Sequence, residues 1–268
     1  MPSSDAPIEI GRVTLTVRDL AAMSTFYQEV LGLHPMAGDA SHVSLGVGDR
    51  VLIALRADPA ARRASRREAG LFHIAFLLPT RHDLAAWLRH VAERGIHWQG
   101  ASDHLVSEAM YLADPEGNGI EVYADRPRAS WRWQGTEIAM DTQPLDLQAL
   151  AARAQAPWRG APEGSVIGHV HLQTGALEAA RQFYTEDLGF DLTCTYRGAL
   201  FFGSGGYHHH LATNIWNSWG AGPRDPKATG IAEIELRLGA EAPEALRARI
   251  GTDLADPWGI RYRLAAQP

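Results

Sequence analysis

Cysteine is almost absent from this chain, which has one cysteine, Cys194, among 268 residues. A single cysteine cannot form an internal disulfide, and it cannot build a cysteine-rich metal site. A chain without disulfides suits a reducing compartment, so we expect a cytoplasmic protein. Any metal site in this chain must therefore be made from histidine, aspartate or glutamate side chains.

Long apolar runs and an excess of positive charge are also missing. No apolar stretch approaches the roughly 20 residues that cross a membrane, and the N-terminal sequence MPSSDAPIE lacks the charged-then-apolar pattern of a signal peptide. The chain has 25 basic and 31 acidic residues, a formal net charge of -6, and no clustered basic face. We therefore expect no nucleic-acid partner and no membrane association.

The most informative feature that is present is an internal repeat. The segment from Ile10 to Leu33 aligns without gaps onto the segment from Ile167 to Phe190, and 11 of the 24 positions are identical. Each copy has an alternating segment typical of a strand, then apolar residues at helical spacing, then a glycine suited to end a helix (Gly32 in the first copy). The chain therefore reads as a tandem duplication. The expected division is a first half at 1–126, a connector at 127–163 and a second half at 164–268.

Each half divides again into two similar units. In the first half, Leu71 to Pro79 reads as a strand and Asp83 to Arg94 as a helix that ends at Gly95, with further strands behind it. In the second half, Gly230 to Leu238 begins the matching unit. The fold class is thus α+β, with four βαβββ units that begin near residues 8, 70, 166 and 229. The connector reads as a surface segment with one short amphipathic helix and no evident chemistry.

A candidate for chemistry lies in the stretch YLADPEGNGIEVY, from Tyr111 to Tyr123. Asp-Pro followed by Gly-Asn-Gly is typical of a tight turn, so the stretch is predicted to form two strands joined by such a turn. On the second strand Glu121 points away from the face that Ile120 and Val122 share. Burying a carboxylate there is costly unless it is paired or binds a metal. On an exposed strand Glu121 would instead be an ordinary surface group.

The four units, together with GHV at a strand start, FHIAF, DPEGNGIEVY and GGYHHH, resemble the vicinal oxygen chelate superfamily. Within it the chain resembles the catechol 2,3-dioxygenase group of extradiol ring-cleaving enzymes. The resemblance implies that the units pair into two barrel-like modules whose sheets curl around a central site. It also implies a divalent metal, usually iron(II), held by two histidines and a glutamate; manganese(II) accepts the same ligands. The superfamily often forms dimers or larger assemblies, so a homo-oligomer is expected.

The same resemblance assigns the ligands position by position. The family has a histidine on the first strand of each unit of a catalytic pair, and a glutamate on the last strand of one of them. These positions hold His73 and Glu121 in unit two and His169 in unit three. Neither half has a full set, so the set closes only if unit two pairs with unit three and unit one with unit four. The second pairing would leave a degenerate site lined by Arg12 and Arg261.

The run from His208 to His210 is expected on a strand, and in the family the acid/base residue beside the metal corresponds to His209. An imidazole titrates near neutrality, so it can take a proton from a catechol and return it later. Alternation would put Tyr207 on the same face as His209 and His208 on the opposite face. The alternative is an incidental polar run or adventitious metal binding.

Further candidates surround these positions. Tyr111 lies ten residues before Glu121, which matches the spacing of the family's tyrosine that hydrogen-bonds to the substrate oxygen; a buried tyrosine at a strand end would look the same. The resemblance makes Tyr111 catalytic beside His209. The candidate substrate contacts are His104, His208 and Trp216. For the tryptophan, ordinary core packing is the alternative.

The function implied is non-haem iron(II)-dependent insertion of O2 into a catechol-type aromatic diol, with a ring-opened semialdehyde as the product. Two rivals stay open. One is a non-redox, metal-dependent enzyme of the same superfamily, such as a glyoxalase-like isomerase or a thiol transferase. Glyoxalase-type sites usually have four protein ligands, and the last strand of unit three offers no glutamate. The other rival is a metal-free protein that binds a small molecule such as an antibiotic.

Overall fold

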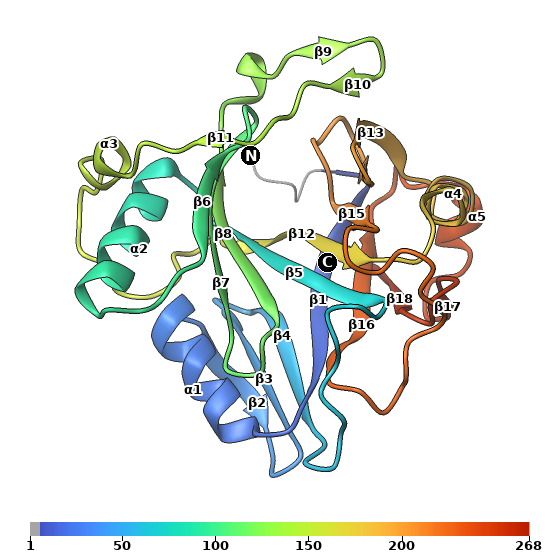
Figure 1. Ribbon diagram of the computed structural model, residues 1–268, viewed down its shortest axis with the longest axis horizontal. Helices are drawn as coiled ribbons and strands as arrows, with labels where there is room; N and C mark the ends of the chain where they lie inside the picture. Colours follow the sequence, from blue (N-terminus) through green and yellow to red (C-terminus); the bar gives the residue numbers. More distant parts are fainter. Residues whose placement is uncertain (1–5, 268) are drawn as a thin grey trace.

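Two curled sheets carry the fold in the computed structural model, which describes residues 6–267 (Figure 1). The seven-stranded sheet combines units one and four, with β1 antiparallel to β16 and parallel to β4. Its strands in spatial order are β17 (Asp253–Ala255), β18 (Arg261–Ala266), β16 (Gly230–Leu238), β1 (Ile8–Val17), β4 (Arg50–Ala57), β3 (His42–Val47) and β2 (His34–Gly38). The helices of these two units are α1 (Leu20–Leu31) and α5 (Glu244–Arg247).

The nine-stranded sheet combines units two and three, with β5 antiparallel to β12 at the junction. Its strands in spatial order are β11 (Gln143–Pro144), β6 (Gly100–Asp103), β7 (Ser107–Ala113), β8 (Gly119–Asp125), β5 (Gly70–Leu77), β12 (Val166–Gln173), β15 (Leu211–Asn214), β14 (Ala199–Gly203) and β13 (Asp191–Tyr196). Its helices are α2 (Arg81–Glu93) and α4 (Leu177–Gln182), and α4 continues as a π-helical turn, η3 (Phe183–Asp187).

This strand order confirms the pairing that the ligand count requires: unit two joins unit three, and unit one joins unit four. The helices lie on the two flanks of the molecule, with α1 and α2 on the left of Figure 1 and α4 and α5 on the right. The fourth unit is shorter than expected. Within the described residues only β17 and β18 follow its helix.

Local sequence signals explain the boundaries of the helices. The Asp19 side chain accepts a hydrogen bond from the backbone N–H of Ala22 and caps α1, which ends at Gly32 in the left-handed region at φ 69°. Thr80 caps α2 in the same way through the N–H of Asp83. The helix expected at Asp83 to Arg94 is therefore present and begins slightly earlier.

The tight turn after β7 is tied to the helix of the neighbouring unit. Asp114 accepts a hydrogen bond from the hydroxyl of Tyr27 on α1, at 3.1 Å. The second half repeats the contact, since Asp256 accepts from the hydroxyl of Tyr184 at 2.9 Å. Burial raises the pKa of both carboxyls to about 6. Each link joins two units of the same half, so the repeated tyrosine and the Asp-Pro turn hold the two sheets together.

The connector is more than a surface segment, which corrects the sequence-based expectation. It contains η2 (Arg128–Ser130), β9 (Trp133–Gln134), β10 (Glu137–Ile138), β11 and α3 (Leu147–Ala151). The hairpin of β9 and β10 stands above the rest of the molecule in Figure 1. β11 extends the nine-stranded sheet beside β6, and residues 140–142 reach the cavity described below.

The expected degenerate site of Arg12 and Arg261 also contains acidic side chains. Nη2 of Arg12 lies 3.2 Å from Oε2 of Glu235 and 3.8 Å from Oε1 of Glu233. Arg261 pairs instead with Asp253 on the neighbouring strand β17, and its side chain is 54% exposed. Carboxylates on the same sheet thus neutralise these arginines, and Glu233, which Arg12 contacts, lies opposite Arg261 in the strand register.

Within residues 6–267, no helix combines the length and the apolar character that a membrane span requires.

Candidate active site

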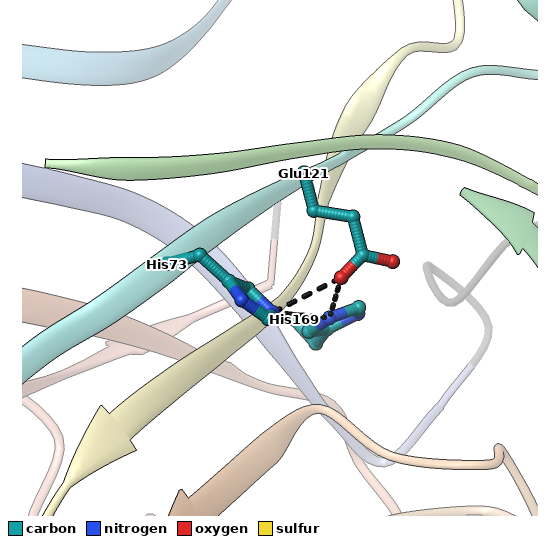
Figure 2. A group of neighbouring side chains, drawn as sticks. All are labelled: His73, Glu121 and His169. Carbon is teal, nitrogen blue, oxygen red and sulfur yellow. Dashed lines mark hydrogen bonds and ion pairs between the residues drawn. The ribbon is translucent and has the colours of Figure 1, made fainter. Parts of the chain in front are cut away.

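Three side chains from three neighbouring strands meet in the nine-stranded sheet: His73 of β5, Glu121 of β8 and His169 of β12 (Figure 2). Nε2 of His73 lies 3.0 Å from Oε2 of Glu121, and Nε2 of His169 lies 3.3 Å from the same oxygen. The two Nε2 atoms are 3.3 Å apart. All three side chains are buried. The three residues expected to be ligands therefore converge on one point, while their role as ligands stays a prediction.

Strand register brings these residues together. β8 runs parallel to β5 with Glu121 opposite Ala75, and β12 runs antiparallel to β5 with His169 opposite the same alanine. Because successive side chains of a strand point to opposite faces, Ile74 and Phe76 enter the main hydrophobic core while His73 faces the cavity. The structure therefore confirms the alternation of side chains that the sequence predicts for β5.

Burial and mutual contacts set the charges of the three groups. Burial lowers the pKa of His169 to about 4, so this imidazole is unprotonated at neutral pH and keeps its lone pair. Burial alone would raise the pKa of Glu121, but the contacts with His169 and His73 outweigh that effect and hold this pKa well below its usual value. An ionised carboxylate beside an unprotonated imidazole is an environment that attracts a divalent cation.

The spacing of the donor atoms fits a metal ion. Ligands at right angles around an ion, each about 2.1 Å away, lie about 3 Å from one another. The observed separations are 3.0, 3.3 and 3.3 Å. Across the described part of the chain, no other group of three histidine, cysteine or acidic side chains brings its donor atoms within 4.8 Å of one another. The donor set suits iron(II) or manganese(II).

A cavity of about 300 Å³ opens beside these residues. Its wall from unit two carries hydrogen-bonding groups, including His104 and Tyr111, whereas its wall from unit three carries the rings of Phe201 and Trp216. The connector contributes Met140 to the same cavity. A small molecule in this space would therefore meet both the three buried side chains and aromatic rings.

His209 lines this cavity beside His169, with the ring centroids 4.1 Å apart. Its Nδ1 lies 2.7 Å from Nδ1 of His208, and Nε2 of His208 lies 2.9 Å from Oδ1 of Asp125. A carboxylate only accepts, so His208 carries its proton on Nε2 and accepts at Nδ1 from the N–H of His209. In this arrangement Nε2 of His209 is the unprotonated nitrogen. Burial lowers the pKa of His209 well below its usual value, which keeps this imidazole neutral.

The expectation that the three consecutive histidines lie on a strand is wrong. Residues 204–210 form an irregular segment between β14 and β15. Gly205 and Gly206 have φ values of 60° and 70°, and two left-handed residues in succession cannot continue a strand. Tyr207 consequently packs on His208, with ring centroids 4.1 Å apart, rather than beside His209.

His208 occupies a different place from the one expected of a substrate contact. It is fully buried and is not among the residues that line the cavity, because its two ring nitrogens face His209 and Asp125. The hydroxyl of Tyr207 also donates to Asp125, at 3.2 Å, and lies 2.8 Å from the hydroxyl of Tyr123. His208 is therefore positioned to act on His209 rather than on a ligand.

Tyr111 and His104 form a second hydrogen-bonded pair in the cavity. Nδ1 of His104 lies 2.8 Å from the backbone carbonyl of Asp141 in the connector, so Nδ1 carries the proton. Nε2 then accepts from the hydroxyl of Tyr111 at 2.6 Å. Burial, followed by the nearby charge of Glu121, raises the pKa of Tyr111 well above its usual value. The tyrosine therefore keeps its proton and can act as a donor.

Two groups near the site were not singled out from the sequence. His171 lines the cavity, lies 5.0 Å from the ring of His73 and pairs with Asn214 at 3.0 Å. Its place two residues after His169 on one strand was a usable signal. The connector residues gave no such signal, because a backbone carbonyl carries no sequence pattern. Trp216, an expected substrate contact, does line the cavity and packs on His171.

Comparison with known proteins identifies relatives of this chain. The sequence profile of the Glyoxalase/Bleomycin resistance protein/Dioxygenase superfamily matches residues 9–122 and 166–232. The chain is 40% identical to a catechol-2,3-dioxygenase of Bacillus subtilis (strain 168), over 86% of this chain and 83% of the relative. It is 29% identical to biphenyl-2,3-diol 1,2-dioxygenase 3 of Rhodococcus globerulus, over 59% of this chain and 86% of that protein.

Solved structures show the same fold. A candidate dioxygenase from Bacillus subtilis covers 97% of this chain and 85% of its own, with a TM-score of 0.65 and 12% identity. Glyoxalase I from Zea mays covers 98% and 94%, with a TM-score of 0.54 and 14% identity. At such identities the likeness concerns the fold alone. From the profile match and the 40% identity, the chain belongs to the glyoxalase/bleomycin resistance protein/dioxygenase superfamily.

Proposed function

We propose that this protein is a non-haem iron(II)-dependent extradiol dioxygenase that inserts O2 into a catechol-type aromatic diol. The observation that carries the proposal is the buried set of His73, Glu121 and His169, with the spacing of three ligands on one face of an ion. Two histidines and one carboxylate with open positions are diagnostic for non-haem iron(II) oxygenases. The two similar dioxygenases support the same class of reaction.

His73, His169 and Glu121 would hold the metal, and manganese(II) would accept the same three ligands. When bound, the metal supplies a template for the diol and O2 and a path for electrons between them. The protein's own part is to orient the diol and to move its protons. The rings of Phe201 and Trp216 would pack against one side of the diol's ring.

His209 would act as the base. Its Nε2 is unprotonated and can accept the proton of a diol hydroxyl, after which the imidazolium can return it to an oxygen of the product. His208 and Asp125 would hold His209 in the required tautomer, since the proton on Nδ1 of His209 is committed to His208. On the opposite wall, the hydroxyl of Tyr111 can turn from His104 towards the other diol oxygen and stabilise charge there.

A glyoxalase-like function fits the ligand set less well. The position in unit three that corresponds to Glu121 holds Ala212, because Glu121 pairs with Ala75 and Ala212 pairs with His171 in the same register. A fourth carboxylate ligand is therefore missing from the place where the fold repeat would put it.

Metal analysis combined with an oxygen-uptake assay tests the proposal. Protein reconstituted with iron(II) without air should bind one metal per chain. With catechol and air it should consume one O2 per diol and form a yellow ring-opened product. Metal binding without O2 consumption, together with isomerisation of a glutathione hemithioacetal, would favour a glyoxalase-like enzyme. Failure to bind either iron(II) or manganese(II) would leave a small-molecule-binding protein.

Replacing Asp125 by asparagine is expected to lower turnover about 10²- to 10³-fold while metal content stays near the wild-type level. An amide can donate to Nε2 of His208, so His208 would then carry its proton on Nδ1 and donate to Nδ1 of His209. His209 would consequently carry its own proton on Nε2, where an unprotonated nitrogen is needed to act as the base. The measurement is kcat and metal content. The control is Asp191→Asn, which changes an exposed carboxylate at the start of β13. Full activity of Asp125→Asn would contradict the tautomer argument.

A further inference from the structure

The walls of the cavity differ in polarity, which bears on the part of a substrate that lies away from the diol. The groups that would handle the diol are His73, Glu121, His169 and His209. Beside them, the cavity is lined by apolar and aromatic side chains from unit two, the connector and unit three. These side chains are Phe72 of β5, Met140 of the connector, Cys194 and Tyr196 of β13, Phe201 of β14 and Trp216 after β15.

Contacts between these side chains give the apolar wall a fixed shape. The ring of Phe72 lies 5.5 Å from Trp216 and 4.9 Å from His171. Nε1 of Trp216 donates to the backbone carbonyl of Arg197 at 2.9 Å, which fixes the indole. The connector is anchored over β13 because Oγ1 of Thr195 donates to Oε1 of Glu137 at 2.9 Å. A substituent on the ring would therefore meet a preformed apolar surface.

The charged side chains at the cavity have one sign. Among the described residues that line it, the ionisable acids are Glu121 and Asp141, and no lysine or arginine is present. Because Glu121 would be committed to the metal, a carboxylate on the substituent would enter a space with no lysine or arginine partner and with Asp141 in its wall. Removing such a carboxylate from water without compensation is costly.

The size of the cavity sets a second limit. About 300 Å³ is at the lower end of the range of small-molecule sites, which is roughly 300–1,000 Å³. This space suits a single aromatic ring with a short substituent rather than a fused ring system.

We infer that the substrate is a monocyclic catechol with an uncharged, apolar substituent, that Met140, Phe201 and Trp216 receive this substituent, and that catechols with a carboxylate side chain are discriminated against. The inference rests on the proposed function, because it assumes that the diol binds at His73, Glu121 and His169. It makes the connector a determinant of specificity, through Met140.

The test compares 3,4-dihydroxyphenylacetate with its methyl ester, which has nearly the same shape and no charge. With the iron(II)-loaded protein, kcat/KM for the ester should exceed that for the acid at least tenfold. The dissociation constants of the two compounds, measured by calorimetry without O2, should differ in the same direction. Equal values, or a preference for the acid, would overturn the inference. Failure to bind or cleave either compound, or catechol itself, would instead count against the proposed function.

A pair of variants tests the part assigned to Met140. Met140→Arg adds a cation at the apolar wall and should shift the ratio of acid to ester at least tenfold towards the acid. Met140→Leu keeps an apolar side chain of similar volume and should preserve the preference for the ester. An unchanged ratio in a folded Met140→Arg protein would show that the substituent does not lie against the connector. If Met140→Arg does not fold, the comparison of acid and ester on the wild-type protein still decides the inference.

Discussion

Glu121→Ala is expected to remove the metal and, with it, all ring-cleaving activity. Glu121 supplies the only carboxylate of the three converging side chains, and its Oε2 is within 3.3 Å of both Nε2 atoms. Changing a group that merely supports a ligand typically costs 10- to 100-fold in metal affinity, so the loss of a ligand should exceed about 100-fold. Metal content after dialysis, measured by elemental analysis, gives the result directly.

A matched control for this variant is Glu235→Ala. Glu235 is likewise a glutamate on a strand, but it is only half-buried, lies in the seven-stranded sheet and pairs with Arg12. Its replacement should leave metal content near one per chain. Full metal occupancy in Glu121→Ala would show that the three side chains are not the ligand set, however well they converge.

His209→Phe is expected to lower turnover by about 10² to 10⁴, the usual contribution of acid/base catalysis, with metal content close to wild type. Phenylalanine fills similar space beside His169 but cannot take a proton at the position of Nε2. The measurement is kcat for a catechol and metal content, side by side. The control is His97→Phe, at an exposed position before β6. Loss of metal in the His209 variant would mean that this histidine is itself a ligand.

The structure also changes what is expected of His208. On a strand it would point away from His209, and its replacement would cost little. In the observed turn its Nδ1 is hydrogen-bonded to His209, so His208→Phe should also lower turnover, although less than His209→Phe. Equal activity of His208→Phe and wild-type protein would contradict the hydrogen-bonded chain to Asp125.

The sheet pairing and the convergence of His73, Glu121 and His169 could be predicted from the sequence because both depend on simple periodicities. The repeat indicates which positions are equivalent, and alternation along a strand fixes the face on which His73 and Glu121 lie. The predicted orientation of His208 was wrong because side chains alternate between two faces only within a strand. The adjacent pair Gly205 and Gly206 was the warning, since both residues take left-handed φ values.

The contribution of the connector could not be read from the sequence for a different reason. Its contact with His104 runs through the backbone carbonyl of Asp141, which any residue would supply. Its approach to the cavity depends on pairing between β11 and β6, two strands that are far apart along the chain. The repeat gives no guidance there, because the connector has no counterpart elsewhere in the chain.

The pairing of the units is nested, with the second and third inside the first and fourth, and this order has a consequence for how the chain folds. During synthesis the inner pair, residues 70–214, can complete its sheet before the chain ends. β1, made first, must wait for β16, because Ile8 pairs with Leu238. Contacts between such distant segments form slowly. The edge of β1 that pairs with β16 therefore lacks its partner until β16 has been synthesised, and an unpaired strand edge is prone to aggregation.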